Sequence, residues 1–428
     1  MRIRLSLALF LCLLSFGFLP AVEAGSSAND FYAGSHKVDI TPLRSVYMGG
    51  QSLDRKSQGV HDPLSCRALA MKSGDTTVVI ASLDVLGLSF IDVEAVRSGV
   101  PLPKENILIT ATHNHSGPDT IGLYGKSLSK RFSNIPVASG RDERYMAYLR
   151  SGAINCVNGA IQNLQPAELY LSQSNQWDLS RNSRVPDSLD PTMAVLRAVN
   201  KEGKTIAVLF NFGAHAEVLK GKKEISADFL GPVYREVEQE FGGTAIFVNG
   251  ALGAMVGPAE NGKRVKSDWE SMEKYGRRFA EAVIITAREG KRVENPDIKV
   301  SREILKIPLL NFRFRLAMAF GLIPERLADG RITSEINFWR LGPAWIVTVP
   351  GEPYPAFAEL LRRRMSGVPN FIFSLANDEL GYVMFENDCR KKLYDYERSM
   401  AVSCKIGHQL YEELSRLMGQ PLTQKERE

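Results

Sequence analysis

Two histidines and one glutamate stand where apolar runs of the chain give way to turns. They are His113, His215 and Glu352. Neutral imidazole and carboxylate groups are good zinc ligands, and a catalytic zinc commonly has three protein ligands and one water. This set therefore matches the ligand type, two histidines and one glutamate, that zinc hydrolases use.

A further histidine, His115, lies two residues after His113. Two residues this far apart at a strand end leave the strand on the same face. The sequence Ser-Gly-Pro at 116–118 cannot continue a strand, so both imidazoles are expected at a rim. Because imidazole titrates near neutrality, we expect His115 to move protons at this rim.

Two more polar residues, Asp84 and Asn249, follow apolar runs in the same way. In open α/β sheets, ligands bind outside the carboxyl ends of the strands. We therefore expect Asp84 and Asn249 to orient the metal-ligating histidines through hydrogen bonds. An equally good interpretation makes them turn residues at strand ends.

The elements that position these residues are short, continuous apolar runs alternating with helical periods. Such runs suit strands buried on both faces. The pattern predicts an α/β fold: a single large domain with a mostly buried mixed β-sheet core, flanked by helices, with the site at the C-terminal ends of the strands. The predicted strands are 77–82, 106–110, 206–212, 245–248, 345–349 and 371–373, and the predicted helices are 145–161, 228–241 and 269–283.

The first 24 residues have the features of a secretory signal peptide. Arg2 and Arg4 precede an apolar run, and small residues before Gly25 offer a cleavage site after Ala24. We therefore expect a secreted or periplasmic protein in which residues 25–428 form one catalytic domain. Of the cysteines left after cleavage, Cys389 and Cys404 are the nearest pair. The sequence leaves open whether they form a disulfide.

Composition narrows the classes of function. The chain has 428 residues, of which 44% are hydrophobic and 24% charged, as is ordinary for a globular protein. The formal net charge is only +5, and no run of five Lys or Arg occurs. The sequence therefore gives no indication of a nucleic-acid partner. It leaves the oligomeric state open.

Several motifs resemble, in order, those of the neutral/alkaline non-lysosomal ceramidases. The most specific is Thr-Ala-Thr-His-Asn-His-Ser-Gly-Pro at 110–118. The others are Val-Asp-Ile-Thr-Pro at 38–42, Gly-Val-His-Asp-Pro-Leu at 59–64, Ser-Leu-Asp at 82–84, Asn-Phe-Gly-Ala-His at 211–215, Val-Pro-Gly-Glu at 349–352 and Gly-Tyr at 381–382. The resemblance covers residues 31 to about 403, the family's N-terminal catalytic domain. The chain ends about where that family's C-terminal immunoglobulin-like domain would begin.

The resemblance implies a zinc ion held by His113, His215, Glu352 and Tyr382. Tyr382 as a ligand follows only from the resemblance, which also places it among the residues that act in catalysis. His115 is then a residue that supports a ligand or faces the substrate, and is not itself a ligand. His61 and Tyr396 match positions that line the family's substrate pocket, although His61 suits a structural role equally well.

The family's substrate-binding arginine has no direct match. Serine stands at 183, where the arginine is expected, so Arg184 or Arg181 takes its place. The resemblance implies a zinc-dependent hydrolase that cleaves the N-acyl amide bond of ceramide, an N-acylsphingosine, or of a related lipid. A metal-dependent esterase or phosphoesterase and a non-catalytic exported binding protein are the alternatives.

A stretch at 312–323 mixes arginines with large apolar residues. It is interpreted either as a lip that meets a lipid tail, with transient contact to a membrane surface, or as a buried connection.

Overall fold

The computed structural model describes residues 31–129, 132–324 and 327–424. The predicted signal peptide, residues 1–24, lies outside the described residues. None of the helices in these ranges has both the length and the apolar character needed to cross a bilayer. The helices are α1 (Phe90–Arg97), α2 (Glu143–Gln162), α3 (Leu230–Phe241), α4 (Trp269–Arg288), α5 (Phe312–Ala319), α6 (Pro355–Arg364), α7 (Glu386–Cys389), α8 (Asp395–Ser399) and α9 (Ile406–Leu417).

Within the described ranges, the larger sheet has nine strands in the order β13-β11-β10-β8-β1-β3-β4-β5, with β16 beside β8. It is mixed, because β4 with β5 and β11 with β13 are parallel pairs, whereas the other pairs are antiparallel. The strands are β1 (Phe31–Asp39), β3 (Ser65–Ser73), β4 (Thr76–Leu83), β5 (Ile107–Ala111), β8 (Gln165–Asn175), β10 (Thr192–Asn200), β11 (Thr205–Phe212), β13 (Thr244–Asn249) and β16 (Lys291–Arg292).

A second sheet has the order β17-β19-β20-β22, with β18 beside β19. Its only parallel pair among the described strands is β20 with β22. The strands are β17 (Ile298–Pro308), β18 (Leu327–Ala328), β19 (Arg331–Leu341), β20 (Ala344–Val349) and β22 (Asn370–Ser374). Short pairs complete the structure: β2 (Gly59–Val60), β6 (Ser127–Ser129), β7 (Phe132–Pro136), β9 (Ser180–Asn182), β12 (Glu224–Ile225), β14 (Val256–Glu260), β15 (Lys263–Arg264), β21 (Glu352–Pro353) and β23 (Tyr382–Val383).

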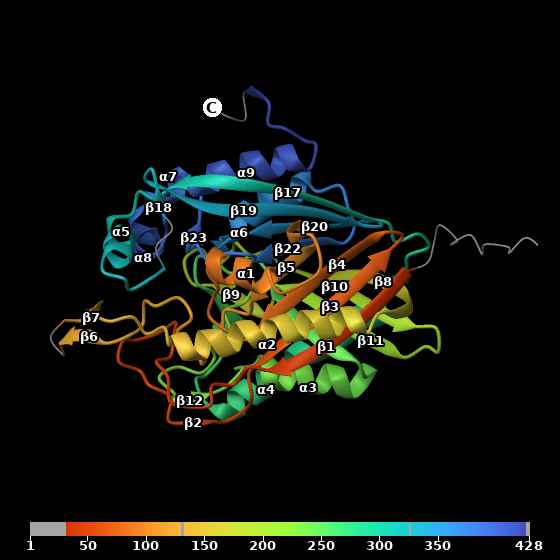
Figure 1. Cartoon of the computed structure of the whole chain (residues 1–428), viewed down its shortest axis with the longest axis horizontal. Helices are drawn as coiled ribbons and strands as arrows, with labels where there is room; N and C mark the ends of the chain where they lie inside the picture. The colour runs from red at the N-terminus through yellow and green to blue at the C-terminus, as the bar shows by residue number, and fades with distance from the viewer. Residues whose placement is uncertain (1–30, 130–131, 325–326, 425–428) are drawn as a thin grey trace, which may run out of the picture.

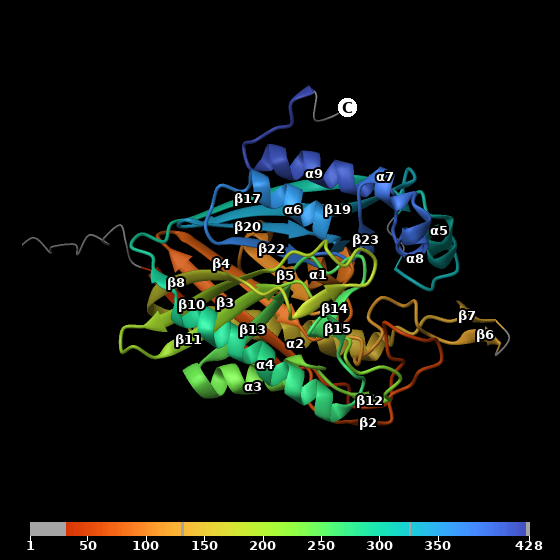
Figure 2. The ribbon, with the colours of Figure 1, turned by 180° about the vertical axis from the view of Figure 1, so that it is seen from behind.

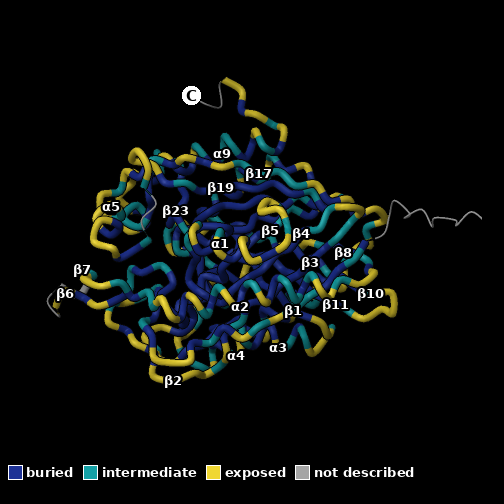
Figure 3. Tube along the Cα trace, in the orientation of Figure 1, coloured by how far each residue is buried: buried dark blue, intermediate teal, exposed yellow. Residues whose placement is uncertain are grey.

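The two sheets face one another, and helices cover their outer faces (Figures 1 and 2). α2, α3 and α4 pack against the larger sheet, and α9 packs against β17 and β19 of the smaller one, beside α6. Buried side chains fill the space between the sheets, among them Trp339, Phe371 and Phe373. Figure 3 shows this buried interior running through the middle of the molecule. The fold is therefore α/β with a mixed sheet core flanked by helices, as predicted, and the second sheet makes four layers in all.

The larger sheet curls until its two edges meet. β13, at one edge, contacts β4 and β5 at the other, and the Ser82 hydroxyl donates a hydrogen bond of 2.6 Å to the carbonyl of Phe247. A right-handed strand twist accumulates across so many strands and brings distant edges together. The carboxyl ends of β5 and β11 consequently lie close to each other.

All six predicted strands and all three predicted helices are present. The apolar stripe of the first helix corresponds to α2, where Asp142 caps the N-terminus by accepting hydrogen bonds from the backbone N–H groups of 144 and 145. α3 ends at Gly242, whose φ of +70° suits glycine and stops the helix there.

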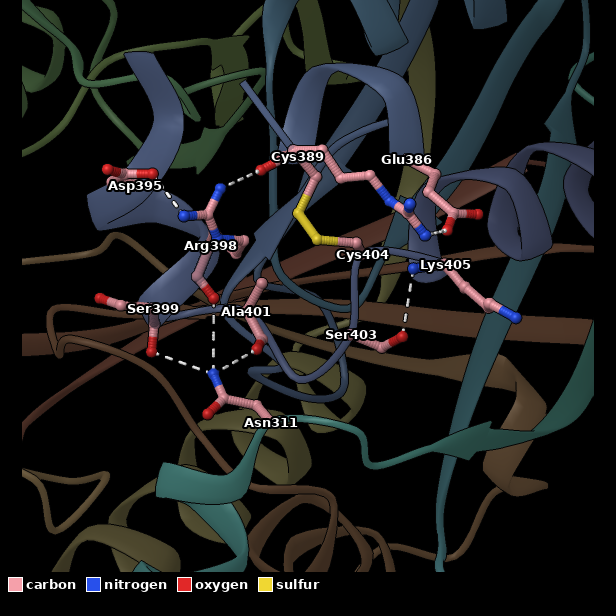
Figure 4. The surroundings of a disulfide bond; sticks show 11 residues. Asn311, Glu386, Cys389, Asp395, Arg398, Ser399, Ala401, Ser403, Cys404 and Lys405 are labelled. Carbon is pink, nitrogen blue, oxygen red and sulfur yellow. Dashed lines mark hydrogen bonds and ion pairs between the residues drawn. A yellow bond between two sulfur atoms is a disulfide. The ribbon is translucent and has the colours of Figure 1, made fainter. Parts of the chain in front are cut away.

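A disulfide joins Cys389 to Cys404, the pair that the sequence left open. It closes a loop that begins at the last residue of α7 and contains α8 (Figure 4). The side chain of Asn311, which caps α5, donates hydrogen bonds to the carbonyls of Ser399 and Ala401 in this loop. α5 and the disulfide-closed loop, residues 389–404, are thus held together.

Candidate active site

The predicted ligand residues lie just after strands of both sheets. His113 follows β5 and His215 follows β11, whereas Glu352 opens β21 after β20 and Tyr382 opens β23 after β22. β21 and β23 run parallel, with Glu352 directly opposite Tyr382. Backbone contacts join these loops: Asn114 bridges Ala216, and the N–H of His115 donates to the carbonyl of Ala216 at 3.1 Å.

His113, His215 and Glu352 converge on one point. Glu352 Oε2 lies 3.5 Å from His113 Nε2 and 3.3 Å from His215 Nε2. Ligand atoms about 2.0–2.2 Å from a tetrahedral ion are roughly 3.3–3.5 Å apart. Glu352 Oε2 is buried and has no hydrogen-bond partner, which a bound cation would supply. These three groups fit a divalent metal ion.

The second nitrogen of each of these imidazoles is fixed by the backbone. His113 Nδ1 donates to the carbonyl of Leu86 at 2.8 Å, and His215 Nδ1 donates to that of Val256 at 2.7 Å. A carbonyl can only accept, so the proton sits on Nδ1 and Nε2 keeps its lone pair. Metal-ligating histidines are commonly oriented by such contacts.

The backbone around the histidines is also constrained. His113 has a φ of +61°, a conformation that non-glycine residues adopt only when their surroundings impose it. Asn249 Nδ2 donates to the carbonyls of Thr112 and Ala214, the residues that precede the two histidines, at 3.0 and 2.9 Å. Asn249 thus positions both histidines through their neighbours.

Burial and mutual contact set the protonation of the cluster. Burial lowers the pKa of His113 to about 3, so its imidazole is neutral at neutral pH. Burial also lowers the pKa of His215, but its contact with Glu352 outweighs that effect and raises it. Burial raises the pKa of Glu352, while the two histidines lower it, and the net shift is downward. A neutral imidazole and an ionised carboxylate are the forms that bind metal.

His115 lies in the same cluster but is held differently. Nitrogens of His113, His115 and His215 lie within 4.8 Å of one another, so the three imidazoles together could also hold a metal ion. Neither nitrogen of His115 has a hydrogen-bond partner, and Nδ1 lies 3.6 Å from Glu217 Oε1. Burial lowers the pKa of His115.

Tyr382 lies in the wall of a cavity of about 40 Å³ in front of this cluster. The cavity has room for an ion with a water, since a water molecule takes about 30 Å³ in the liquid. The Tyr382 hydroxyl lies 3.5 Å from Met255 Sδ. Burial raises the pKa of the Tyr382 hydroxyl well above its ordinary value, and Glu352 adds to the effect.

A second cavity of about 790 Å³ adjoins the first and is mostly apolar. The two share wall residues, which are Leu123, Tyr124, Phe314, Tyr396 and Met400. Phe314 belongs to α5, and Tyr396 and Met400 belong to the disulfide-closed loop. The elements held together by Asn311 therefore form the entrance to the site.

Three predicted residues lie apart from the cluster formed by His113, His115, His215 and Glu352 (the metal-type cluster). His61 stacks on Trp269, with ring centroids 3.8 Å apart, and is not among the residues that line either cavity. Arg184 Nε donates to Glu397 Oε1 at 2.6 Å, which ties it to α8 next to Tyr396. The hydrogen bonds that the described structure gives the Asp84 carboxylate come from Ser65 and Tyr234, not from a histidine.

Sequence reasoning missed Glu217 and Glu379. Glu217 lies two residues after His215, just as His115 lies two residues after His113. This shared spacing could have drawn attention to Glu217. It faces His115 and also binds Arg264 at 2.8 Å. Glu379 lies in the wall of the small cavity. It belongs to a loop with no periodic pattern, so no signal in the sequence marks it.

The buried cluster of histidines and a carboxylate at strand ends is a site that could hold a metal ion. The chain belongs to the neutral/alkaline non-lysosomal ceramidase family, whose N-terminal model matches residues 31–261. It is 26% identical over 238 residues to a neutral ceramidase of Pseudomonas aeruginosa, and 24% identical over 221 residues to one of Mycobacterium tuberculosis. These alignments cover 50% and 46% of this chain but only 34% and 33% of the relatives, so the chain matches about a third of their length.

Solved structures give the same picture of the fold. The crystal structure of the neutral ceramidase from Pseudomonas aeruginosa superposes with a TM-score of 0.74 at 18% identity, covering 93% of this chain and 76% of the other. A structure described as ceramidase complexed with C2 gives a TM-score of 0.72 at 17% identity, covering 92% and 76%. Nearly the whole described fold is thus shared with these proteins.

Proposed function

We propose that this protein is an exported zinc-dependent hydrolase that cleaves the N-acyl amide bond of ceramide or of a similar lipid amide. The observation that carries the proposal is the triangle of His113 Nε2, His215 Nε2 and Glu352 Oε2, whose spacing suits a tetrahedral ion. Membership of the ceramidase family supports the choice of an amide lipid as substrate.

Zinc is the metal that two histidines and a carboxylate favour, and Tyr382 is proposed as the fourth protein ligand. When bound, zinc lowers the pKa of a water molecule and polarises the amide carbonyl. Other residues of the chain orient the ligand side chains. The carbonyls of Leu86 and Val256 fix the ligand imidazoles, and Asn249 fixes the backbone before each of them.

Hydrolysis takes a proton from the attacking water and gives one to the leaving amine, and His115 is proposed to carry this proton from the one to the other. Its Nδ1 faces the Glu217 carboxylate, so Nε2 is the nitrogen free to face the substrate. The pKa of Glu217 is lowered, since His115 outweighs the effect of burial, and this carboxylate stays ionised near neutral pH. Glu217 therefore stabilises the protonated form of the ring during the reaction.

The larger cavity supports a substrate with a long apolar chain. It opens beside the metal-type cluster and is lined by Leu53, Leu123, Leu316, Phe320 and other apolar groups. Phe312 and Phe320, at the two ends of α5, are 67% and 74% exposed. We propose that α5 meets a lipid surface transiently while one chain of the lipid enters this cavity.

The experiment that tests the proposal compares two histidine variants of the purified protein. His113→Ala is expected to lose both bound zinc, measured by elemental analysis, and hydrolysis of a fluorescent N-acylsphingosine. His115→Ala is expected to keep zinc and to lose most turnover. His408→Ala, a histidine exposed on α9, is the matched control and is expected to change neither.

Stoichiometric zinc in the His113→Ala protein would contradict the ligand assignment. Equal loss of zinc and turnover in His115→Ala would make His115 a ligand. Parallel assays on an ester and a phosphoester of the same chain length distinguish the amide from the alternative bonds, and faster cleavage of either would overturn the assignment of an amide substrate.

A further inference from the structure

Glu379 has one carboxyl oxygen that the fold uses and one that it does not. It lies in the loop between β22 and β23, in the wall of the small cavity. Its Oε1 accepts a hydrogen bond of 2.9 Å from the N–H of Gly381. Its Oε2 is buried and has no hydrogen-bond partner.

The side chain is held in place by close packing. A Cβ atom on Gly87 would lie 2.9 Å from Cγ of Glu379, so the carboxyl arm lies directly over this glycine. The loop that carries it is fixed at both ends, because Asn377 donates to Glu335 and Tyr382 pairs across from Glu352. Glu379 therefore cannot easily turn its free oxygen elsewhere.

A buried polar oxygen without a partner costs free energy that the fold does not recover. Among the described residues, no lysine or arginine forms an ion pair with Glu379. Burial raises the pKa of this carboxyl well above its ordinary value, and the nearby Glu352 adds to the effect. Unpartnered polar groups that line a cavity are typical of places where a ligand completes the hydrogen bonding.

We infer that Glu379 is a substrate-binding residue whose Oε2 hydrogen-bonds a hydroxyl group on the amine half of the substrate. The inference rests on the proposed amidohydrolase function and specifies which part of the substrate this side of the cavity recognises. A hydroxyl both donates and accepts, so it pairs with a carboxyl oxygen in either protonation state. The assignment is therefore independent of the charge on Glu379.

The position of Glu379 separates the two halves of the substrate. It lines the small cavity beside His113 and Tyr382 but is not among the residues that line the large apolar cavity. An amide cleaved at the metal-type cluster would place one apolar chain in the large cavity and its polar, hydroxyl-bearing carbons against Glu379. A purely structural role would need only Oε1, which already caps the backbone at Gly381.

The test measures kcat/KM of each protein variant on two substrates. One substrate is an N-acyl amino alcohol, and the other is the same N-acyl amine with its hydroxyl groups replaced by hydrogen. Wild-type protein is expected to favour the hydroxylated substrate in kcat/KM by roughly 10- to 100-fold, since a site built for a hydrogen bond rejects an analogue that lacks it. Glu379→Leu is expected to lose this preference because its kcat/KM falls for the hydroxylated substrate and stays the same for the other.

Glu379→Gln keeps one oxygen for the N–H of Gly381 and one amide group for the hydroxyl, so it is expected to retain the preference. Glu359→Leu, the same change at an exposed site on α6, is the matched control and is expected to behave like wild type. Zinc content and thermal unfolding are measured for each protein.

Equal losses on both substrates in Glu379→Leu would overturn the inference, because a structural role predicts that pattern. An unchanged preference in that variant, or a lost preference in a folded Glu379→Gln, would overturn it as well. If Glu379→Leu does not fold, the comparison of wild type with Glu379→Gln decides. Wild-type protein that cleaves neither amide refutes the proposed function itself, whereas equal cleavage of both refutes only the role of Glu379.

Discussion

Gly50 lies against the imidazole of His115, and the contact leaves no room for a side chain. A Cβ atom at this position would lie 2.5 Å from Cγ of His115, and the φ of +85° favours glycine in any case. The backbone of His115 is fixed from the other side, because Arg55 donates to its carbonyl. The ring of His115 is thus positioned by its packing, since its own nitrogens make no hydrogen bonds.

Gly50→Ala is expected to push His115 out of place and to lower turnover by roughly 10- to 100-fold, as loss of a positioned proton donor does. Bound zinc is expected to stay stoichiometric, because His113 and His215 are held by their own backbone contacts. Gly74→Ala is the matched control: its φ is +56° but nothing lies within 4 Å of the added methyl group. Equal losses in the two variants would attribute the effect to backbone strain.

Sequence reasoning could place His113, His215 and Glu352 because each follows a recognisable apolar strand. Sequence reasoning could not tell which of the polar residues around them would contact the histidines or their neighbours. Asp84 and Asn249 looked alike in sequence, yet Asn249 bonds the backbone beside both histidines whereas Asp84 bonds Ser65 and Tyr234. Which neighbour a strand-end side chain reaches depends on how the strands are brought together.

At the scale of elements, the disulfide-closed loop forms one wall of both cavities. Cys389→Ser with Cys404→Ser removes a cross-link whose partners are 15 residues apart, and this is expected to lower the free energy of unfolding by about 3 kcal/mol. Because Tyr396 and Met400 then move more freely, KM is expected to rise more than kcat falls. Urea unfolding and steady-state kinetics measure the two effects.

The double variant also supplies its own control. A reducing agent is expected to raise KM of the wild-type protein toward that of the double variant, and to leave the variant unchanged. A variant whose KM equals that of the oxidised wild type would show that Asn311 alone holds the loop in place.

α5 is the element expected to meet lipid. Phe312→Ser with Phe320→Ser is expected to weaken sedimentation with lipid vesicles by at least about tenfold, since burying a phenylalanine contributes about 1.5–3 kcal/mol. Hydrolysis of a soluble amide whose chain is too short to reach Phe320 in the large cavity is expected to be unchanged. Ile285→Ser on α4, which is 51% exposed, is the control. If it weakens vesicle binding as much, α5 has no special part in contact with the membrane.

β17, which sequence reasoning missed, differs from the predicted strands in how it is buried. β4, β5, β11 and β13 read as continuous apolar runs because both faces are covered. β17 carries Lys299, Arg302 and Glu303 on partly open faces, so its pattern resembles a polar loop. No local pattern in the sequence predicts that one sheet packs upon the other, because this packing depends on contacts between residues far apart in the chain.

At the scale of the whole molecule, a buried ion pair connects the two sheets close to the site. Arg97 on α1 donates to both oxygens of Glu335 on β19, at 2.9 and 2.8 Å, and both side chains are fully buried. Asn377 donates to the same carboxylate at 2.7 Å. Glu335 therefore holds the loop after β22 as well as the interface between layers.

Glu335→Gln is expected to lower the free energy of unfolding by about 3 kcal/mol, because it leaves the buried Arg97 with only the partly exposed Glu94, at 3.2 Å, as a counter-charge. Burial raises the pKa of Glu335, but Arg97 and Arg302 lower it by more than burial raises it. The folded pKa therefore lies below the ordinary 4.5. The stabilisation is therefore fully present above pH 4.5 and lost as pH falls through the folded pKa.

Urea unfolding at pH 7, 5 and 4 measures this dependence. The difference in stability between wild type and Glu335→Gln is expected to shrink at the lowest pH. Glu281→Gln, an exposed residue on α4, is the control. A difference that stays constant across this range would mean that Glu335 contributes through its shape and not its charge.

The proposed metal ligands are divided between the sheets, with His113 and His215 on the larger sheet and Glu352 and Tyr382 following strands of the smaller one. Neither half of the polypeptide carries all four of these proposed ligands. A break in the backbone near residue 295, between α4 and β17, would yield two fragments that must reassociate before either gains a complete coordination shell. Ion uptake by such a mixture would therefore report complementation of the two halves.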